Sequence, residues 1–290
     1  MKYNLLRKLI RRFIVFTILL VICPILLFYY SRNIEPKLLD VNQFVIESKS
    51  VSNESDGFKI VQFSDTHLGS EYSLTQLQGL VENINDQNPN LIVFTGDLID
   101  NSAIYKEKNE ISPILMQLKA TYGKYAIYGN HDVGGAGKTV YSQVLTNAEF
   151  TILENASKTI QLKDGHEFSI IGLDDYLLGK PNPKNAFKKI NKNAFSILLV
   201  HEPDIANRLN EYPIDVQLSG HSHGGQVKLP FHKAIYTPPL ATKYTEGLYE
   251  IKKSLKPMKL YVNRGIGTTR LPVRFFSQPE LSVFTLRSLK

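Results

Sequence analysis

Five short apolar runs in this chain each stop at a side chain that can bind a metal ion. The runs KIVQFS, LIVFTG, KYAIYG, SILLV and IDVQLSG are followed by Asp65, Asp97, Asn130, His201 and His221, respectively. Continuous apolar runs of this length are typical of strands that are buried on both faces of a parallel sheet. Because the carboxyl ends of parallel strands meet at one edge, these side chains are expected to converge. The pattern therefore predicts a metal centre at the strand ends.

The order of strand-like and helix-like segments predicts an α/β fold. Strand patterns at 59–63, 91–95 and 125–128 alternate with helical patterns at 73–84 and 111–118, which predicts βαβαβ and a largely parallel sheet. The second half is richer in strand patterns, at 159–162, 167–173, 196–200, 215–218, 248–251, 259–263 and 281–286. We expect mixed or antiparallel pairing in that half.

The N-terminus is basic and then apolar. Five Lys or Arg residues within 2–12 precede an uncharged apolar stretch over 13–30. A helix needs about 17 to 25 residues to cross a bilayer, so this stretch is long enough. No small-x-small cleavage site follows, so we expect an uncleaved anchor, with a cleaved signal peptide as the alternative. The basic flank predicts a cytoplasmic N-terminus and an extracytoplasmic domain at the cell membrane.

Most of the net charge of +7 lies in this N-terminal segment. Residues 1–32 contain no acidic residue, and the remainder of the chain is close to neutral, which argues against nucleic acid as a partner. The only cysteine, Cys23, lies inside the apolar stretch, so we expect neither a disulfide framework nor a Cys-ligated zinc. The predicted organisation is an anchor (1–32), a stalk with an initial strand (33–56) and a globular domain (57–290).

Most of the short motifs that contain these candidate ligands also have an ordinary structural interpretation when each is taken alone. Asp65 and His67 could cap a helix and occupy a loop, GNHD at 129–132 could form a turn, and a lone His201 is more often a core histidine. The GHSHGG sequence at 220–225 is harder to explain in this way. Two imidazoles beside three glycines indicate close backbone approach around a bound group.

Taken in order, the motifs resemble those of the calcineurin-like metallophosphoesterase superfamily. They are DxH at 65–67, GD at 96–97, GNHD at 129–132, His201 and GHxH at 220–223. The resemblance extends through the tail RGIGTTRLPVRFF, as in membrane-anchored bacterial members similar to UDP-diacylglucosamine-cleaving phosphodiesterases. It covers most of the chain after about residue 43, and it implies a four-layer α/β/β/α sandwich.

The resemblance also implies two divalent or trivalent metal ions, of the Mn, Fe or Zn type. Its ligand sets, carried over to this chain, are Asp65, His67 and His223 for one ion, Asn130, His201 and His221 for the other, and Asp97 as the bridge. Such an ion pair makes hydroxide from a bridging water and clamps phosphoryl oxygens during in-line attack. No protein nucleophile is then needed.

Further residues are implied around that centre. His131 would protonate the leaving oxygen, and either Asp132 or Asp100 would hold its ring in the working tautomer. Arg264, Arg270 and Arg274 could contact phosphate or carboxylate groups of the substrate, and structural ion pairing is an equally open interpretation. GGAGKT at 134–139 is not expected to bind nucleotide phosphates, because a Walker motif needs Gly where Asp132 stands. His166 and His232 are expected at the surface.

The sequence favours an enzyme over the alternatives. Serine/threonine phosphatases of this superfamily have GDxxDRG and GNHE, whereas Asp100 is followed here by Asn101, so a phosphoprotein substrate is not expected. We expect a monomeric hydrolase of a phosphodiester, pyrophosphate or phosphomonoester, acting on a phosphorylated small-molecule or lipid-linked substrate of the cell envelope. The alternative is a membrane-tethered metal-binding or scaffolding protein without catalysis.

Overall fold

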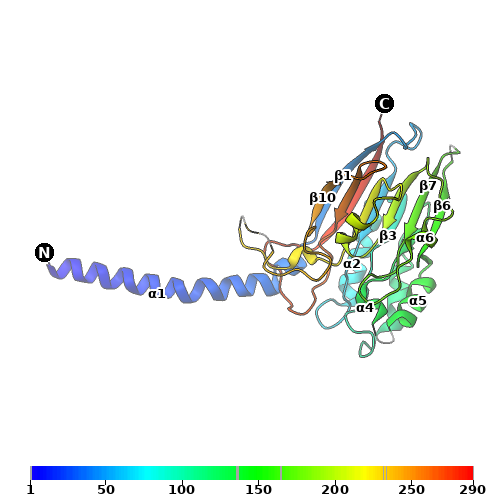
Figure 1. The fold of residues 1–290 in the computed structure, drawn as a ribbon. Helices are drawn as coiled ribbons and strands as arrows, with labels where there is room; N and C mark the ends of the chain where they lie inside the picture. The colour runs from blue at the N-terminus through cyan, green and yellow to red at the C-terminus, as the bar shows by residue number, and fades with distance from the viewer. Residues whose placement is uncertain (1, 135–136, 164, 231, 233, 290) are drawn as a thin grey trace.

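The computed structural model describes residues 2–134, 137–163, 165–230, 232 and 234–289. A long helix, α1 (Lys2–Asn33), stands apart from two sheets with helices packed against them (Figure 1). The apolar part of α1 is not buried against the protein, and by length and composition it could cross a membrane. A short 3-10 helix, η1 (Glu35–Lys37), connects it to the first strand.

The first sheet has six strands in the order β1-β12-β2-β3-β4-β5. Their bounds are β1 Asp40–Ser48, β2 Lys59–Phe63, β3 Leu91–Phe94, β4 Lys124–Ala126, β5 Phe150–Ile152 and β12 Glu280–Ser288. Strands β2 to β5 are parallel, as the βαβαβ pattern predicts, and β12 runs antiparallel to β2. β1 pairs in parallel with β12. The first and last strands of the chain therefore lie side by side at one edge of this sheet.

The second sheet also has six strands, in the order β10-β11-β9-β8-β7-β6. Their bounds are β6 Ala156–Gln161, β7 Glu167–Gly172, β8 Phe195–Leu199, β9 Val216–Ser219, β10 Gly247–Ile251 and β11 Met258–Val262. The four inner strands are parallel, and β6 and β10 run antiparallel at the two edges. This confirms the mixed pairing expected for the second half.

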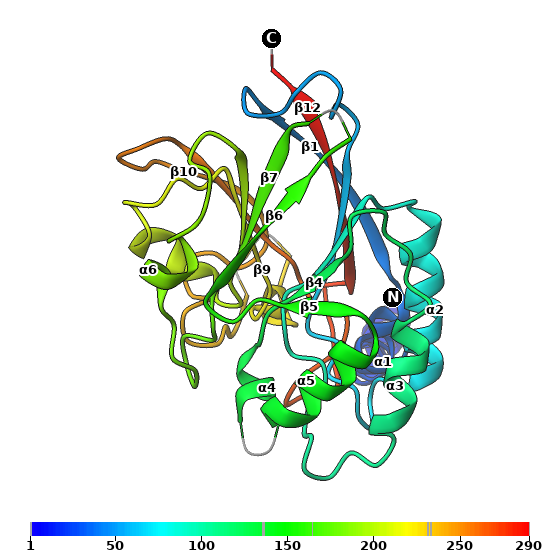
Figure 2. The same ribbon diagram turned by 90° about the vertical axis from the view of Figure 1, so that its right-hand side faces the viewer.

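Helices cover the outer faces of the two sheets. α2 (Leu74–Asp86), α3 (Lys108–Leu115) and α5 (Gly137–Asn147) pack on the first sheet, while α6 (Pro183–Ala186) and the 3-10 helix η2 (Pro203–Arg208) lie on the second (Figure 2). Ser73 begins α2 with a capping box to Gln76. Short elements such as β5 and α6, of three and four residues, were not predicted because they are too short to show a periodic pattern.

Three apolar clusters hold these layers together. Val61 and Phe63 of β2 face the helices, whereas Ile60 faces the second sheet, where it meets residues such as Ile197 of β8. Strands β2 and β3 are therefore buried on both faces, which explains why their sequences lack a regular polar alternation. The third cluster lies outside the second sheet, so the predicted four-layer α/β/β/α arrangement is confirmed.

Candidate metal centre

The predicted ligands lie where the central strands of both sheets end. Asp65, Asp97 and His221 come two or three residues after β2, β3 and β9, and His201 comes two residues after β8. Asn130 begins a one-turn helix, α4 (Asn130–Val133), directly after the turn that follows β4. The two sheets thus bring residues that are far apart in sequence to one edge.

Five of the predicted ligands have a left-handed backbone. They are Asp65, His67, Asp97, His221 and His223, with φ angles of 52°, 45°, 60°, 68° and 51°. A non-glycine residue in this region costs about 1 to 3 kcal/mol, and such residues cluster at functional sites. The strain turns successive side chains toward one point instead of letting them alternate along extended strands.

One cluster contains Asp65, His67 and His223. The Nε2 atoms of the two histidines are 3.1 Å apart, and Oδ1 of Asp65 lies 3.5 Å from His223 Nε2 and 4.0 Å from His67 Nε2. All three side chains are buried. Their donor atoms face one another within the reach of a single metal ion.

The other cluster contains Asp97, His201 and His221, with Asn130 beside it. His201 Nε2 lies 3.3 Å from Asp97 Oδ2. Its Nδ1 is 2.7 Å from the carbonyl oxygen of Thr95, and His221 Nε2 is 2.9 Å from the carbonyl oxygen of Pro239. These carbonyl contacts leave Nε2 of His201 and Nδ1 of His221 available as ligands, as is usual for metal-binding histidines.

Asp97 lies between the clusters. Its Oδ2 is 3.5 Å from His67 Nε2 and 3.3 Å from His201 Nε2, while its Oδ1 accepts the backbone N–H of His131 at 2.9 Å. The side chain is therefore oriented by the protein and contacts both histidine sets. This is the position that a bridging ligand needs.

Unsatisfied polar atoms indicate that the protein alone does not complete this site. Oδ1 of Asn130 and Nε2 of His201 are buried and have no hydrogen-bond partner among the described residues. Buried polar atoms are rarely left in this state. A donor set of imidazole nitrogens, carboxylates and one amide oxygen suits Mn, Fe or Zn ions, so the residues fit the predicted dinuclear centre.

Two glycines leave room for the carboxylates. A Cβ atom at Gly129 would lie 2.3 Å from Asp97 Oδ1, and one at Gly220 would lie 2.2 Å from Asp65 Oδ2. Both distances are far below van der Waals contact. A side chain at either position would displace a predicted metal ligand.

His131 lies at the edge of the centre and is partly exposed. Its Nδ1 is 2.7 Å from the carbonyl oxygen of Asp100, which leaves Nε2 available for a substrate. Burial lowers the pKa of His131, but the charges of Asp97 and Asp100 and the carbonyl contact outweigh it and raise the pKa above its usual value. The geometry and the charge both favour a protonated ring that could act as an acid.

Of the two residues expected as alternatives to hold the His131 ring, Asp132 and Asp100, Asp132 lies away from the ring. Its carboxylate is buried and accepts three backbone N–H groups, from Asp97 at 2.7 Å, Gly129 at 2.8 Å and Leu98 at 3.0 Å. Burial and the Asp97 charge raise the pKa of Asp132 to about 8, against the effect of the three donors. Asp132 therefore connects the loop that carries Asp97 to the loop that carries Asn130. The contact to the His131 ring comes instead from the carbonyl oxygen of Asp100.

Burial shifts His221 and His223 toward the neutral form that binds metals, whereas at His201 the charges of Asp97 and Asp65 outweigh burial and raise the pKa well above its usual value. Burial lowers the pKa of His221 to about 4, with a further contribution from the charge of His201. Burial also lowers the pKa of His223, with His67 as the next cause. Neutral imidazole is the ligand form, so the shifts of His221 and His223 suit the assignment.

The three predicted substrate arginines separate into two structural residues and one candidate. Arg274 is fully buried and donates to the carbonyl oxygens of four residues, Arg264, Gly265, Gly267 and Ser277. Arg264 pairs with Asp40 at 2.6 Å and with Glu280 at 3.2 Å. Arg270 is exposed and lines a cavity beside the metal centre, so it is the one of the three arginines that is available for a substrate contact.

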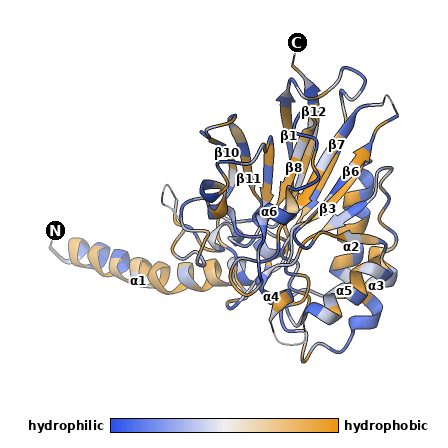
Figure 3. Ribbon diagram, turned by 45° about the vertical axis from the view of Figure 1, so that its right-hand side comes forward, coloured by the Kyte–Doolittle hydropathy of each residue, from blue (hydrophilic) through white to orange (hydrophobic). Residues whose placement is uncertain are grey.

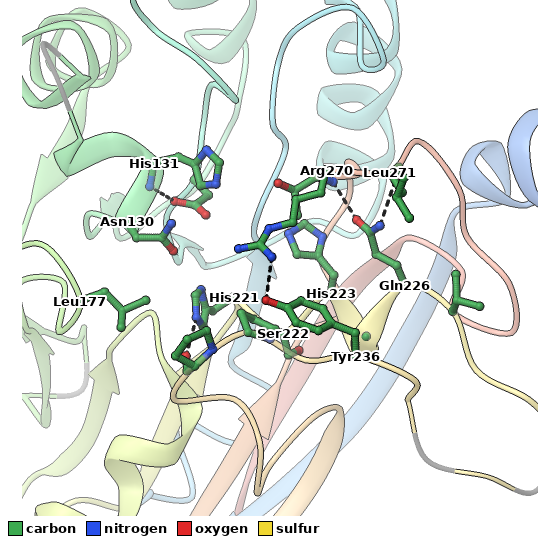
Figure 4. A pocket seen from close by; sticks show the side chains of 16 residues that line it. Asn130, His131, Leu177, His221, Ser222, His223, Gln226, Tyr236, Arg270 and Leu271 are labelled. Atoms are coloured by element: carbon green, nitrogen blue, oxygen red, sulfur yellow. Dashed lines mark hydrogen bonds between the residues drawn. The ribbon is translucent and has the colours of Figure 1, made fainter.

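A cavity of about 350 Å³ opens beside the metal centre. Figure 4 shows Asn130, His131 and His221 on one side of it and Gln226, Tyr236, Arg270 and Leu271 on the other. Arg270 donates to the hydroxyl of Tyr236 at 2.8 Å. Leu177, Gln226, Tyr236 and Leu271 were not predicted, because they lie on loops and carry no ligand-type motif.

The remaining sequence predictions concern residues away from the centre. His166 and His232 are exposed, as expected. Residues 135 and 136 of the GGAGKT sequence lie outside the described residues, and Gly137 begins α5. A Cβ atom at Gly137 would lie 2.6 Å from the carbonyl oxygen of Asp132, so this glycine permits close packing of α5 on the ligand loop.

Comparisons with known proteins find related sequences over most of the chain. The model of the calcineurin-like phosphoesterase family matches residues 58–225. The chain is 46% identical over 259 residues to the uncharacterized metallophosphoesterase YkuE of Bacillus subtilis (strain 168), covering 89% of each chain. It is 31% identical over 294 residues to the uncharacterized metallophosphoesterase Cj0846 of Campylobacter jejuni, covering 99% of this chain and 72% of that one.

A further relative carries a more specific name. The chain is 28% identical over 321 residues to the UDP-2,3-diacylglucosamine pyrophosphatase LpxG of Chlamydia muridarum (strain MoPn / Nigg). This match covers 91% of the present chain and 94% of the relative.

Proposed function

The chain belongs to the calcineurin-like phosphoesterase family of metal-dependent phosphoester hydrolases, and from this we propose that it cleaves a phosphodiester or pyrophosphate bond in a cell-envelope substrate. A phosphomonoester is the alternative substrate of the same chemistry. The observation that carries the proposal is the convergence of two Asp/His clusters on Asp97 at the floor of a cavity.

The chain's own residues position and protonate the reacting groups in this proposal. Two bound ions would supply Lewis acidity, which polarises the phosphoryl group and lowers the pKa of water. Asp97 would fix the ions relative to His131, because one of its oxygens accepts the His131 N–H. His131 would then donate its Nε2 proton to the leaving oxygen, a role worth about 10² to 10⁴ in rate.

Arg270 would recognise a second negative charge on the substrate. It lines the same cavity as Asn130, His221 and His223, and its guanidinium donates to the Tyr236 hydroxyl and lies 5.2 Å from the centroid of the Tyr236 ring. An oriented guanidinium suits a phosphate oxygen pair. The name of the Chlamydia relative supports a pyrophosphate in this place.

The location of the enzyme is also part of the proposal. The basic residues before α1 support a cytoplasmic N-terminus, and the domain would then face the outside of the cell membrane as a monomer. The near-neutral charge of the domain gives no support to nucleic acid as a substrate.

The test is an assay of the full chain in detergent on matched p-nitrophenyl phosphodiesters, pyrophosphates and phosphomonoesters, with Mn, Zn or Fe supplied. We expect hydrolysis of the diester or pyrophosphate to exceed that of the monoester. His131→Asn should keep its metal content and lose turnover. No metal-dependent hydrolysis of any class, in a protein that holds its metals, would instead favour the non-catalytic scaffold.

A further inference from the structure

The end of α1 is fixed to a loop of the domain rather than joined to it by a free linker. The N–H of Arg274 donates to the carbonyl oxygen of Ser31 at 2.8 Å, and the N–H of Ser277 donates to Glu35 Oε1 at 2.6 Å. The rings of Tyr30 and Phe275 meet edge to face with centroids 6.5 Å apart. Residues 274–277 therefore lie at the level of the last turn of α1.

That level corresponds to the boundary of a bilayer that α1 would cross. The uncharged stretch ends at Tyr30, and the first charged residue after it, Arg32, pairs with Glu71 at 2.7 Å. Tyrosines are enriched at the membrane–water interface, where Tyr29 and Tyr30 would lie. Phe275 shares this depth because its ring contacts that of Tyr30.

Five large exposed apolar side chains lie on the two segments that pair at Val227 and Phe275, next to this junction. We call them the apolar rim, and they are 50% to 66% exposed: Leu229, Ile235, Tyr236, Leu271 and Phe276. In Figures 1 and 3, the loop between η3 (His223–Gly225) and β10 runs beside the final turns of α1. Patches of this kind on a soluble surface mark interaction sites.

Backbone hydrogen bonds connect the segment that carries Leu229 and Ile235 to the segment that packs against the end of α1. The N–H of Lys228 donates to the carbonyl oxygen of Phe275 at 2.9 Å, and the N–H of Ile235 donates to that of Val227 at 3.1 Å. Phe276 has a φ angle of 56°, a conformation that bulky residues rarely adopt. The backbone thus holds Phe276 outward next to Phe275.

The rim is continuous with the cavity of the metal centre. Tyr236 and Leu271 belong to both, and Arg270 lies between them and the predicted ligands. A substrate whose phosphate lies at the metal centre could therefore extend an apolar tail from the cavity to the rim. Arg270 would lie where the polar and apolar parts of such a substrate meet.

We propose that the apolar rim enters the same bilayer as α1, so that the cavity opens at the membrane surface and takes a phosphoester whose apolar tail stays in the bilayer. The membrane contact rests on α1 spanning the bilayer, and the substrate class rests on the hydrolase function proposed above. The apolar faces of helices that lie in the membrane interface insert by about 5 to 10 Å, which sets the scale of the expected depth.

Fluorescence can test the membrane contact, because the chain contains no tryptophan. The full chain carrying Ile235→Trp or Phe276→Trp is reconstituted in phosphatidylcholine vesicles with or without brominated acyl chains. Leu255→Trp is the matched control, since Leu255 is 60% exposed in the turn between β10 and β11, at the far end of β11 from the site. We expect bromine to quench most of the emission at 235 and 276 and little at 255; equal quenching at all three positions would overturn the proposal.

Activity on two matched substrates tests the substrate class. Ethyl p-nitrophenyl phosphate is soluble in water, whereas hexadecyl p-nitrophenyl phosphate resides in the bilayer, and both release the same product. Leu229, Ile235 and Phe276 do not line the cavity. The triple variant Leu229→Ser, Ile235→Ser, Phe276→Ser should lose at least tenfold on the hexadecyl ester, a change of about 1.4 kcal/mol, and keep its rate on the ethyl ester.

The outcomes distinguish a failure of the proposed role of the rim from a failure of the proposed hydrolase function. Equal rates for wild type and triple variant on the hexadecyl ester would overturn the rim's role in substrate uptake while leaving the hydrolase intact. Quenching at 235 and 276 without hydrolysis of either ester would support the membrane contact and overturn the hydrolase function.

Discussion

Asp132→Asn distinguishes a structural carboxylate from a catalytic one. In the structure, one oxygen of Asp132 accepts the N–H groups of Asp97 and Gly129, and the other accepts that of Leu98. An asparagine side chain can keep the first pair with its oxygen. Its amide N–H₂ group would then face the Leu98 N–H, so two donors would oppose each other.

The expected loss of stability in Asp132→Asn comes from one broken hydrogen bond, which leaves one buried N–H group without an acceptor. Leaving a buried N–H without a partner costs about 1 to 3 kcal/mol, so Asp132→Asn should reduce the free energy of unfolding by that amount. For a domain of this size, the melting temperature should fall by about 2 to 12 °C. Asp132→Ala leaves three donors unpaired, and we expect it to lose about 3 kcal/mol or more.

The measurement is thermal and denaturant unfolding of the full chain in detergent, together with turnover at several pH values. Asp100→Asn is the control for unfolding only, because its side chain is 48% exposed and its carbonyl contact to His131 is unchanged, whereas the loss of its charge should itself lower the pKa of His131. Asp100→Asn should unfold like the wild type. If Asp132→Asn keeps full stability but shifts the pH profile, Asp132 acts on His131 and our structural assignment is wrong.

Three further predictions concern packing around the centre. Gly220→Ala should misplace Asp65 and cut turnover about 10²-fold, whereas Gly79→Ala, with nothing within 4 Å of the new Cβ, should not; equal activity of both would contradict the packing argument. Arg274→Lys should lower the free energy of unfolding by about 2 kcal/mol or more because carbonyl oxygens lose their donors, while the exposed Arg270→Lys should stay within about 0.5 kcal/mol. Chelation should lower the melting temperature of the wild type, since bound ions stabilise the folded state; an unchanged melting transition in the metal-depleted protein would count against a preformed centre.

The sheet and its ligand-bearing ends could be predicted from local sequence alone. Runs such as KIVQF and LIVF are apolar on both faces because β2 and β3 are buried between helices and the second sheet. β2 ends two residues before Asp65, and β3 ends three residues before Asp97. The positions of Asp65 and Asp97 therefore marked both the end of a strand and the edge at which the site lies.

Contacts made by the backbone could not be predicted in this way. The ring of His131 is oriented by a carbonyl oxygen of Asp100, and every residue offers the same carbonyl group. Asp132 was a reasonable candidate because it is adjacent in sequence, yet α4 turns its carboxylate toward the N–H groups of another loop. The same reason explains why Arg274, which satisfies carbonyl oxygens, resembled a substrate residue.

The most direct test of the dinuclear centre is the metal content of the purified full chain, measured by mass spectrometry for the wild type and for Asp97→Ala. Asp97 contacts both histidine sets, so its removal should weaken both sites at once. We predict close to two ions per wild-type chain and fewer than one in the variant. One ion or none in the wild type, or two retained without Asp97, would contradict a pair of ions joined by this carboxylate.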